Sequence, residues 1–99
     1  MNMKRVSKFG LCLLSALALN AFAQDNWAGK DLNVSFSNKR IDGFNFENSK
    51  AVKNTTDFRR ATGEGPNFAG ANLTEVSFQN AVISNANFEK ANLSKVTIS

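Results

Sequence analysis

The 99-residue sequence contains no histidine and no tyrosine, and it has only one cysteine, one proline and one tryptophan. Histidine is the usual general base near neutral pH and a common zinc ligand, so its absence removes the most frequent forms of both chemistries. The eight carboxylates are spread along the chain without a marked pair. We therefore predict a non-enzymatic protein with no catalytic residues, no cofactor and no metal site.

The first 23 residues have the three-part order of a secretory signal peptide. A basic start containing Lys4, Arg5 and Lys8 precedes a largely apolar run from Leu11 to Leu19. This run is too short to span a bilayer as a helix, which needs ~20 residues. The single cysteine, Cys12, lies within it and does not follow a lipoprotein-type motif.

A cleavage site is expected directly after the apolar run, because Ala21 and Ala23 supply the small residues that such sites require. Cleavage would leave Gln24 as the first residue of an exported chain, for which we expect the bacterial periplasm. The alternative is an uncleaved N-terminal helix lying on a membrane. Export would also remove the only cysteine, so stability must come from packing alone.

The positive charge of the chain comes mostly from this leader. The formal net charge is +4, but three of the twelve basic residues and none of the eight acidic ones precede Gln24. The remaining chain thus has nine basic and eight acidic residues and is nearly neutral. A strongly basic surface for nucleic acid is therefore not expected.

A large apolar residue recurs at every fifth position from Phe58 to the end of the sequence, except at Gly63, and the residue two places before each is nearly always small or β-branched. Helices return an apolar side chain about every 3.6 residues and strands every second residue, so neither accounts for this period. A chain that turns a corner every five residues would, and fixed-period similarity is typical of solenoids. The predicted core residues are Phe58, Phe68, Leu73, Phe78, Ile83, Phe88, Leu93 and Ile98.

Twenty residues make the best internal match, because residues 66–78 align with residues 86–98 at identical asparagine, phenylalanine, alanine, leucine and valine positions. Four corners of five residues then complete one coil. Phe68 should lie against Phe88, and Leu73 against Leu93, with main-chain groups paired between neighbouring coils.

The pattern resembles the pentapeptide-repeat family, whose consensus is Ala-(Asp/Asn)-Leu-x-x. The nearest matches are Ala71-Asn72-Leu73-Thr74-Glu75 and Ala91-Asn92-Leu93-Ser94-Lys95, while Ala86-Asn87-Phe88-Glu89-Lys90 carries the accepted phenylalanine. The resemblance covers residues 66–98. It implies an all-β fold, a right-handed four-sided β-helix, which we expect to have about three coils.

The expected organisation is a signal peptide at residues 1–23, a leader or cap at 24–33 and the β-helix at 34–99. Phe36, Ile41 and Phe46 share the five-residue period but are two residues out of phase with Phe58, which predicts an insertion near residues 53–55. Trp27 either caps the first coil or lies in a flexible leader. Gly63 leaves an inward position empty, so we expect a bent or protruding corner at residues 61–66.

The last coil should present an open apolar end, which favours a homodimer through the C-terminal coil. Family members that protect DNA gyrase are dimers of this kind, so the resemblance implies the same. The alternative is a monomer with a frayed last turn.

Four basic residues, Lys50, Lys53, Arg59 and Arg60, lie close together in the sequence and are candidates for surface binding. They are either an ordinary solvated corner or a site for an anionic surface or an acidic partner; nucleic acid is not favoured. We expect a protein-binding or scaffolding module of the cell envelope. The alternatives are a cytoplasmic topoisomerase or nucleic-acid modulator of the DNA-mimic type, and a small secreted effector.

Overall fold

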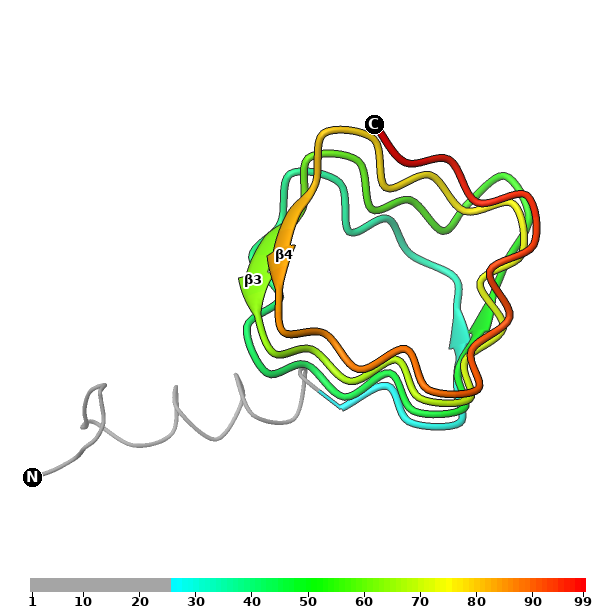
Figure 1. Ribbon diagram of the computed structural model, residues 1–99. Coiled ribbons are helices and arrows are strands. Elements are labelled where there is room, and N and C mark those ends of the chain that lie inside the picture. The colour runs from blue at the N-terminus through cyan, green and yellow to red at the C-terminus, as the bar shows by residue number, and fades with distance from the viewer. Residues whose placement is uncertain (1–25) are drawn as a thin grey trace, which may run out of the picture.

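The computed structural model describes residues 26–99, and the predicted signal peptide with Ala21, Ala23 and Gln24 lies outside the described residues. The described chain winds in successive coils around one axis, as Figure 1 shows in a view along that axis. It contains short strands and turns and no helix, and nothing within residues 26–99 is a helix long and apolar enough to cross a membrane.

Four short strands are named, and all of their pairings are parallel. β1 (Asp31–Leu32) pairs with β2 (Lys50–Ala51), and β3 (Thr62–Glu64) pairs with β4 (Val82–Ser84). The two pairs lie on opposite sides of the coils (Figure 1). Isolated parallel bridges such as Asn67–Asn87 and Asn72–Asn92 continue the pairing elsewhere.

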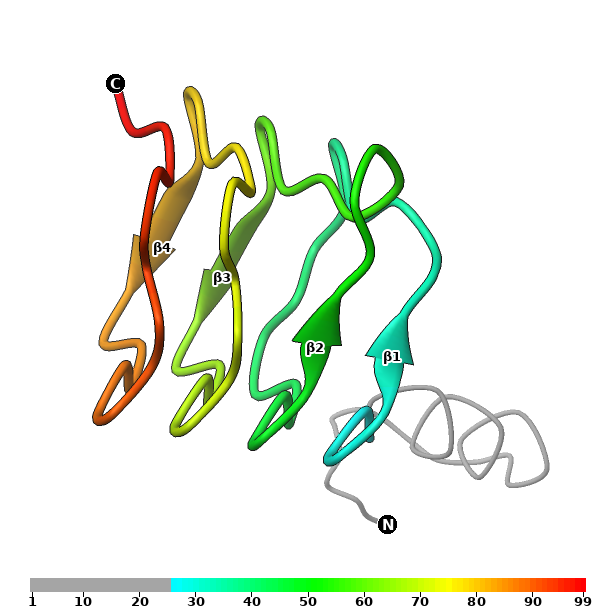
Figure 2. The same cartoon turned by 90° about the vertical axis from the view of Figure 1, so that its right-hand side faces the viewer.

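Pairing registers define the coils. Partners lie twenty residues apart from Thr62–Val82 onwards, as the internal match predicted. Asn26 pairs with Asn45, and Asn45 pairs with Asn67. We therefore define coil 1 as residues 26–44, coil 2 as 45–66, coil 3 as 67–86 and coil 4 as 87–99; Figure 2 shows them side by side.

The N-terminal boundary differs from the expected one. Residues 26–33 pair with coil 2 and form the start of coil 1, whereas we expected a leader or cap at residues 24–33. Three complete coils and a partial fourth are thus described. Trp27 lies edge-on to Phe36, with ring centroids 5.4 Å apart, and Leu32 is fully buried. The prediction failed here because the step from Leu32 to Phe36 is four residues, which hid the period.

The predicted insertion is confirmed at residues 52–56. Lys50 pairs with Asn72 and Ser35 pairs with Asp57, so coil 2 takes seven residues from Lys50 to Asp57 where a regular side takes five. The extra residues form a loop that departs from the regular path of the coil, seen in green in Figure 2. Thr56 links the two ends of this loop to each other and to coil 1. Its Oγ1 accepts the Val52 N–H at 2.7 Å and donates to the Leu32 carbonyl at 2.5 Å.

Most corners are tight turns in which the carbonyl of the inward residue accepts the N–H three residues on. Ala71 N donates to Phe68 O at 3.0 Å, and Val76 N donates to Leu73 O at 3.1 Å. The third residue of these turns has a positive φ, 67° at both Gly70 and Glu75. A hydrogen-bonded turn with positive φ at this position has type II geometry. The small residue that follows then points inward.

Two stacks of phenylalanine fill the core. Phe36, Phe58 and Phe78 form one stack, with centroids 5.0 Å apart and rings within 11° of parallel. The other stack is Phe46, Phe68 and Phe88, with centroids 4.7 and 5.0 Å apart. Rings of the two stacks meet edge to face. Burying each ring contributes about 1.5–3 kcal/mol, and aromatic pairing adds about 0.5–1.5 kcal/mol.

Predicted core residues divide according to the coil that they occupy. Phe58, Phe68 and Leu73 are fully buried and Phe78 nearly so, while Ile83 is half-buried. Phe88, Leu93 and Ile98 are 37, 40 and 74% exposed. They hold inward positions of coil 4, as the stacking of Phe88 on Phe68 shows, but no further coil covers them within the described residues.

Residues 61–66 do not form the protruding corner that we predicted. Thr62–Glu64 is the regular strand β3, and Thr62 also pairs with Arg40 of coil 1. A Cβ at Gly63 would lie 2.9 Å from the Ile41 carbonyl carbon and 3.2 Å from Ile41 Cγ1. The inward position is therefore occupied from the neighbouring coil, and glycine permits close approach of the two backbones.

Candidate functional site

The four sides of the coils are named here by the inward residue that each has in coil 3: the Phe68, Leu73, Phe78 and Ile83 sides. A polar groove of about 440 Å³ lies on the Phe78 side, next to the inserted loop. It is larger than the two other hollows described below. Its lining comprises Ser35, Asn54, Thr55, Thr56, Asp57, Arg59, Glu75, Ser77, Gln79 and Thr97.

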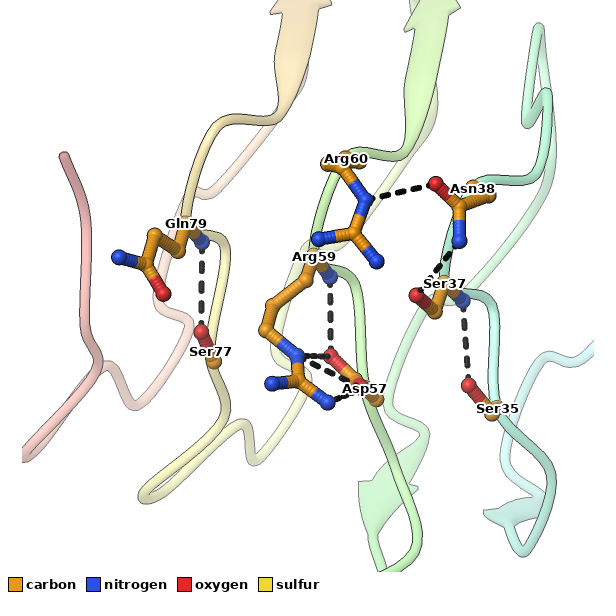
Figure 3. Close-up of polar contacts among 8 residues, drawn as sticks. All are labelled: Ser35, Ser37, Asn38, Asp57, Arg59, Arg60, Ser77 and Gln79. Atoms are coloured by element: carbon orange, nitrogen blue, oxygen red, sulfur yellow. Dashed lines mark hydrogen bonds and ion pairs between the residues drawn. The ribbon is translucent and has the colours of Figure 1, made fainter.

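The floor of the groove is a row of equivalent residues, each directly before an inward residue. Ser35 pairs with Asp57, and Ser77 pairs with Thr97, so these side chains recur once per coil. In three coils the side-chain oxygen accepts the N–H two residues on, at 3.2 Å in Ser35, 2.9 Å in Asp57 and 3.3 Å in Ser77 (Figure 3). This local bond explains why serine and aspartate suit the position.

Asp57 and Arg59 form an ion pair within the groove (Figure 3). Arg59 Nη2 lies 2.8 Å from Asp57 Oδ2, and Arg59 Nε donates to both carboxylate oxygens at 3.0 and 3.1 Å. The side-chain hydrogen bond from Arg59 lowers the pKa of Asp57, and the same bond raises the pKa of Arg59. The pair makes the groove nearly neutral at this point.

The predicted basic cluster is distributed over two sides and the loop between them. Lys50 is in β2 on the Leu73 side, Lys53 is in the inserted loop, and Arg59 and Arg60 follow Phe58 on the Phe78 side. Arg60 Nε donates to Asn38 Oδ1 at 2.7 Å, as Figure 3 shows. Since Arg59 is paired with Asp57, the cluster presents less free charge than its sequence suggests. Surface binding by these four residues stays a prediction.

A smaller notch on the Phe68 side lies between Glu47 of coil 2 and Glu89 of coil 4. Ala69 and Gly70 form its floor, and its volume is about 220 Å³. Across residues 26–99 no three histidine, cysteine or carboxylate side chains come together where they could hold a metal ion. Among the described side chains, neither hollow joins a serine or threonine to a histidine, since the sequence contains no histidine.

The open face of coil 4 is apolar, in contrast to the two polar hollows. It surrounds a hollow of about 270 Å³. The side chains around it are Phe78, Ala81, Ile83, Phe88, Leu93, Val96 and Ile98. An apolar surface of this kind, with polar residues at the corners, is typical of a contact surface for another macromolecule.

Sequence reasoning missed how the asparagine before each inward residue works. Oδ1 of Asn67, Asn72 and Asn92 accepts the N–H two residues on, at 2.9, 3.2 and 3.0 Å. The regular spacing of asparagine was visible in the sequence and could have revealed this role, because such local bonds are typical of asparagine in turns. Nothing comparable in the sequence indicated the positive φ of Arg60, Lys90 and Lys95.

Comparison with family models matches pentapeptide repeats, in eight copies, to residues 56–99. Comparison with curated proteins finds no match. The matched region includes coil 3, the partial coil 4 and the residues that carried the sequence resemblance. Proteins of this family are generally structural or binding modules rather than enzymes. Residues 56–99 belong to the pentapeptide-repeat family, which confirms the family predicted from the sequence.

Proposed function

We propose that this chain is an exported, non-enzymatic module that binds or scaffolds protein in the cell envelope. Its framework would be a right-handed, four-sided β-helix, the fold that the family resemblance implies. Support comes from the inter-coil hydrogen bonds, such as Phe46 N to Asn67 O and Phe68 N to Asn87 O, both 2.7 Å. A frame held in this way presents its outward side chains at fixed spacing, which suits a scaffold.

The open face of coil 4 is the observation that carries this proposal. It exposes Phe88, Leu93 and Ile98, whereas the matching residues of coil 3, Phe68, Leu73 and Phe78, are buried. Exposing apolar side chains together costs free energy that a partner recovers by covering them. The partner that we propose for this face is a second copy of the chain.

Self-association through this face is supported by its chemistry. In a two-fold dimer the same surface meets itself, so apolar residues cover apolar residues without needing a foreign partner. The rim carries both signs of charge, with Glu89 and Lys90 adjacent and Lys95 at the next corner. Opposite charges can then face each other across a two-fold axis.

Sedimentation equilibrium of the purified protein tests the dimer. Ile98→Lys should weaken dimerisation at least tenfold, because it places a charge in the centre of the contact. Val82→Lys is the matched control, since Val82 is 68% exposed on the Ile83 side and Ile98 is 74% exposed. A wild-type protein that stays monomeric at about 100 µM would overturn the dimer.

Export is tested separately by measuring the intact mass of the protein recovered from periplasm, cytoplasm and medium. A species beginning at Gln24 in the periplasm supports the envelope module. A full-length species in the cytoplasm would contradict export and favour the topoisomerase or nucleic-acid modulator. Accumulation in the medium during contact with other cells would instead favour a secreted effector.

A further inference from the structure

The groove on the Phe78 side lacks the features of a protein interface. Its lining contains hydroxyl, amide and charged side chains and not one apolar side chain. Specific protein interfaces have an apolar centre surrounded by a polar rim, and this groove has no such centre. Its ligand must therefore be recognised by hydrogen bonds.

Charge also restricts the ligand. The charged side chains of the lining are Asp57, Arg59 and Glu75, and the first two form an ion pair. The groove thus carries a slight negative charge from Glu75. A polyanion such as nucleic acid requires several free cationic side chains, so it does not fit this groove.

Hydrogen-bonding capacity remains free along the groove. Within residues 26–99, the side chains of Glu75, Gln79 and Thr97 donate to and accept from no other protein group. Ser77 Oγ accepts one N–H and can still donate its own proton. Donors and acceptors are therefore both available, which is what a ligand rich in hydroxyl groups needs.

The polar groups on the floor of the groove repeat along the axis of the coils. Ser35, Asp57, Ser77 and Thr97 occupy the same position in four successive coils. Neighbouring strands lie about 4.8 Å apart, so this row extends over roughly 14 Å. The inserted loop, with Asn54 and Thr55, forms one wall beside the row. A ligand that matches the row must itself be straight and polar, with hydroxyl groups recurring along its length.

From these features we propose that the groove on the Phe78 side binds a neutral, straight glycan, lying along the axis of the coils. The ligand class is a β-1,4-linked sugar chain, whose hydroxyl groups would bond to Ser77, Gln79 and Thr97. No aromatic ring lines the groove to stack on a sugar face, so binding of short chains should be weak. This inference concerns a different surface from the open face of coil 4 and does not depend on the compartment of the protein.

The test is an NMR titration of the isotope-labelled protein with chitotetraose, using maltotetraose and a heparin tetrasaccharide as comparisons. We expect chitotetraose to shift the amide signals of residues 77–79 and the loop, with a millimolar dissociation constant. Maltotetraose, whose α-1,4 linkages curl the chain, should bind at least fivefold more weakly. Equal binding of maltotetraose, preferential binding of heparin, or no shift with chitotetraose would each overturn the proposal.

Two groove variants and one control locate the site. Ser77→Gln fills the groove and should weaken binding at least fivefold. The variant should fold, because the equivalent position of the neighbouring coils already holds the larger side chains of Asp57 and Thr97. Gln79→Ala should weaken binding about threefold, because it removes one hydrogen-bonding group and the net free energy of a single hydrogen bond is small. Ser84→Gln changes an exposed serine of β4 on the Ile83 side and should have no effect. Chitotetraose binding that is equal in all four proteins would overturn the assignment to this groove.

Discussion

At the scale of single residues, the side chain in the small inward position decides how well a corner packs. Ser49, Ala71 and Ala91 hold this position on the corner after the Phe68 side. Ser49 is fully buried, and its Oγ has no hydrogen-bond partner within the described residues. A buried hydroxyl without a partner loses its bonds to water and gains nothing in return.

Replacing Ser49 with alanine should therefore stabilise the protein by about 1 kcal/mol, because the desolvation penalty of the hydroxyl disappears. Equilibrium urea unfolding of the two proteins measures the difference. Ser84→Ala is a control at an exposed serine and should change stability little. A Ser49→Ala protein less stable than wild type would show that the hydroxyl makes a bond in solution.

Asp57 should make stability depend on pH. Its pKa is lowered in the folded protein by the side-chain hydrogen bond from Arg59. The ionised form is thus favoured by folding, and the resulting stability is present above the unfolded pKa of about 3.9 and is lost as pH falls through the folded pKa.

Asp57→Asn isolates this contribution, because an asparagine oxygen can still accept the Arg59 N–H but cannot form the ion pair. Thermal unfolding should show wild type slightly more stable than Asp57→Asn at neutral pH. The gap should close as the pH is lowered below about 4. A gap that is constant from pH 7 to pH 2 would mean that the ion pair contributes nothing.

At the scale of elements, β3 shows how close the backbones of neighbouring coils come. The Cβ of an alanine at Gly63 would lie 2.9 Å from the Ile41 carbonyl carbon and 3.0 Å from the Asp42 nitrogen. Both are backbone atoms, so relief requires the coils to separate locally. The role of this glycine is to permit contact between strands, and it does not form a bend.

Gly63→Ala should destabilise the protein by about 1–2 kcal/mol, as overpacking of a well-filled core does. Thr62→Ala, an exposed change in the same strand, is the control for altered strand propensity. Chemical unfolding of both variants gives the comparison. Stability equal to that of wild type in Gly63→Ala would show that coils 1 and 2 are not in close contact at β3.

The sequence was sufficient to predict the elements that repeat regularly. The period of five, the coil of twenty and the insertion near residue 54 all follow from side chains whose burial depends on their position in the repeat. Coil 1 was only partly predicted, because its short step between Leu32 and Phe36 breaks the period. The shape at Gly63 was missed because it depends on Ile41, which is far away in the sequence and adjacent in space.

The candidate site was harder to predict than the fold. The groove depends on residues from four coils and on a loop that interrupts the repeat, and a linear pattern does not show which outward residues share a side. The ion pair between Asp57 and Arg59 also neutralises one of the four basic residues of the cluster that the sequence had suggested. Outward residues are not restricted by packing, so the repeat carries little information about them.

At the scale of the whole molecule, the two phenylalanine stacks link all the coils into one core. Phe78 contacts Phe58 in its own stack and Phe68 and Phe88 in the other. Folding of one coil therefore depends on its neighbours, as in other solenoids. Damage at the centre of a stack should affect the whole molecule.

Phe78→Asp should abolish folding, because it leaves a cavity and buries an unpaired charge among aromatic rings. Circular dichroism and thermal unfolding would report the loss of the β spectrum and of a cooperative transition. Gln79→Asp places the same carboxylate one residue away on the exposed surface and should fold normally. A folded Phe78→Asp protein with a native transition would contradict the assignment of Phe78 to the core.

Contact between residues one coil apart is the central claim, and NMR measures it directly. The structure predicts nuclear Overhauser effects between residues twenty apart in coils 3 and 4, from Asn67 to Asn87 and from Asn72 to Asn92, and between the rings of Phe68 and Phe88. Their observation would establish the stacked coils in solution. Cross-peaks confined to residues three or four apart, with none between residues twenty apart, would contradict the fold and the two surfaces proposed on it.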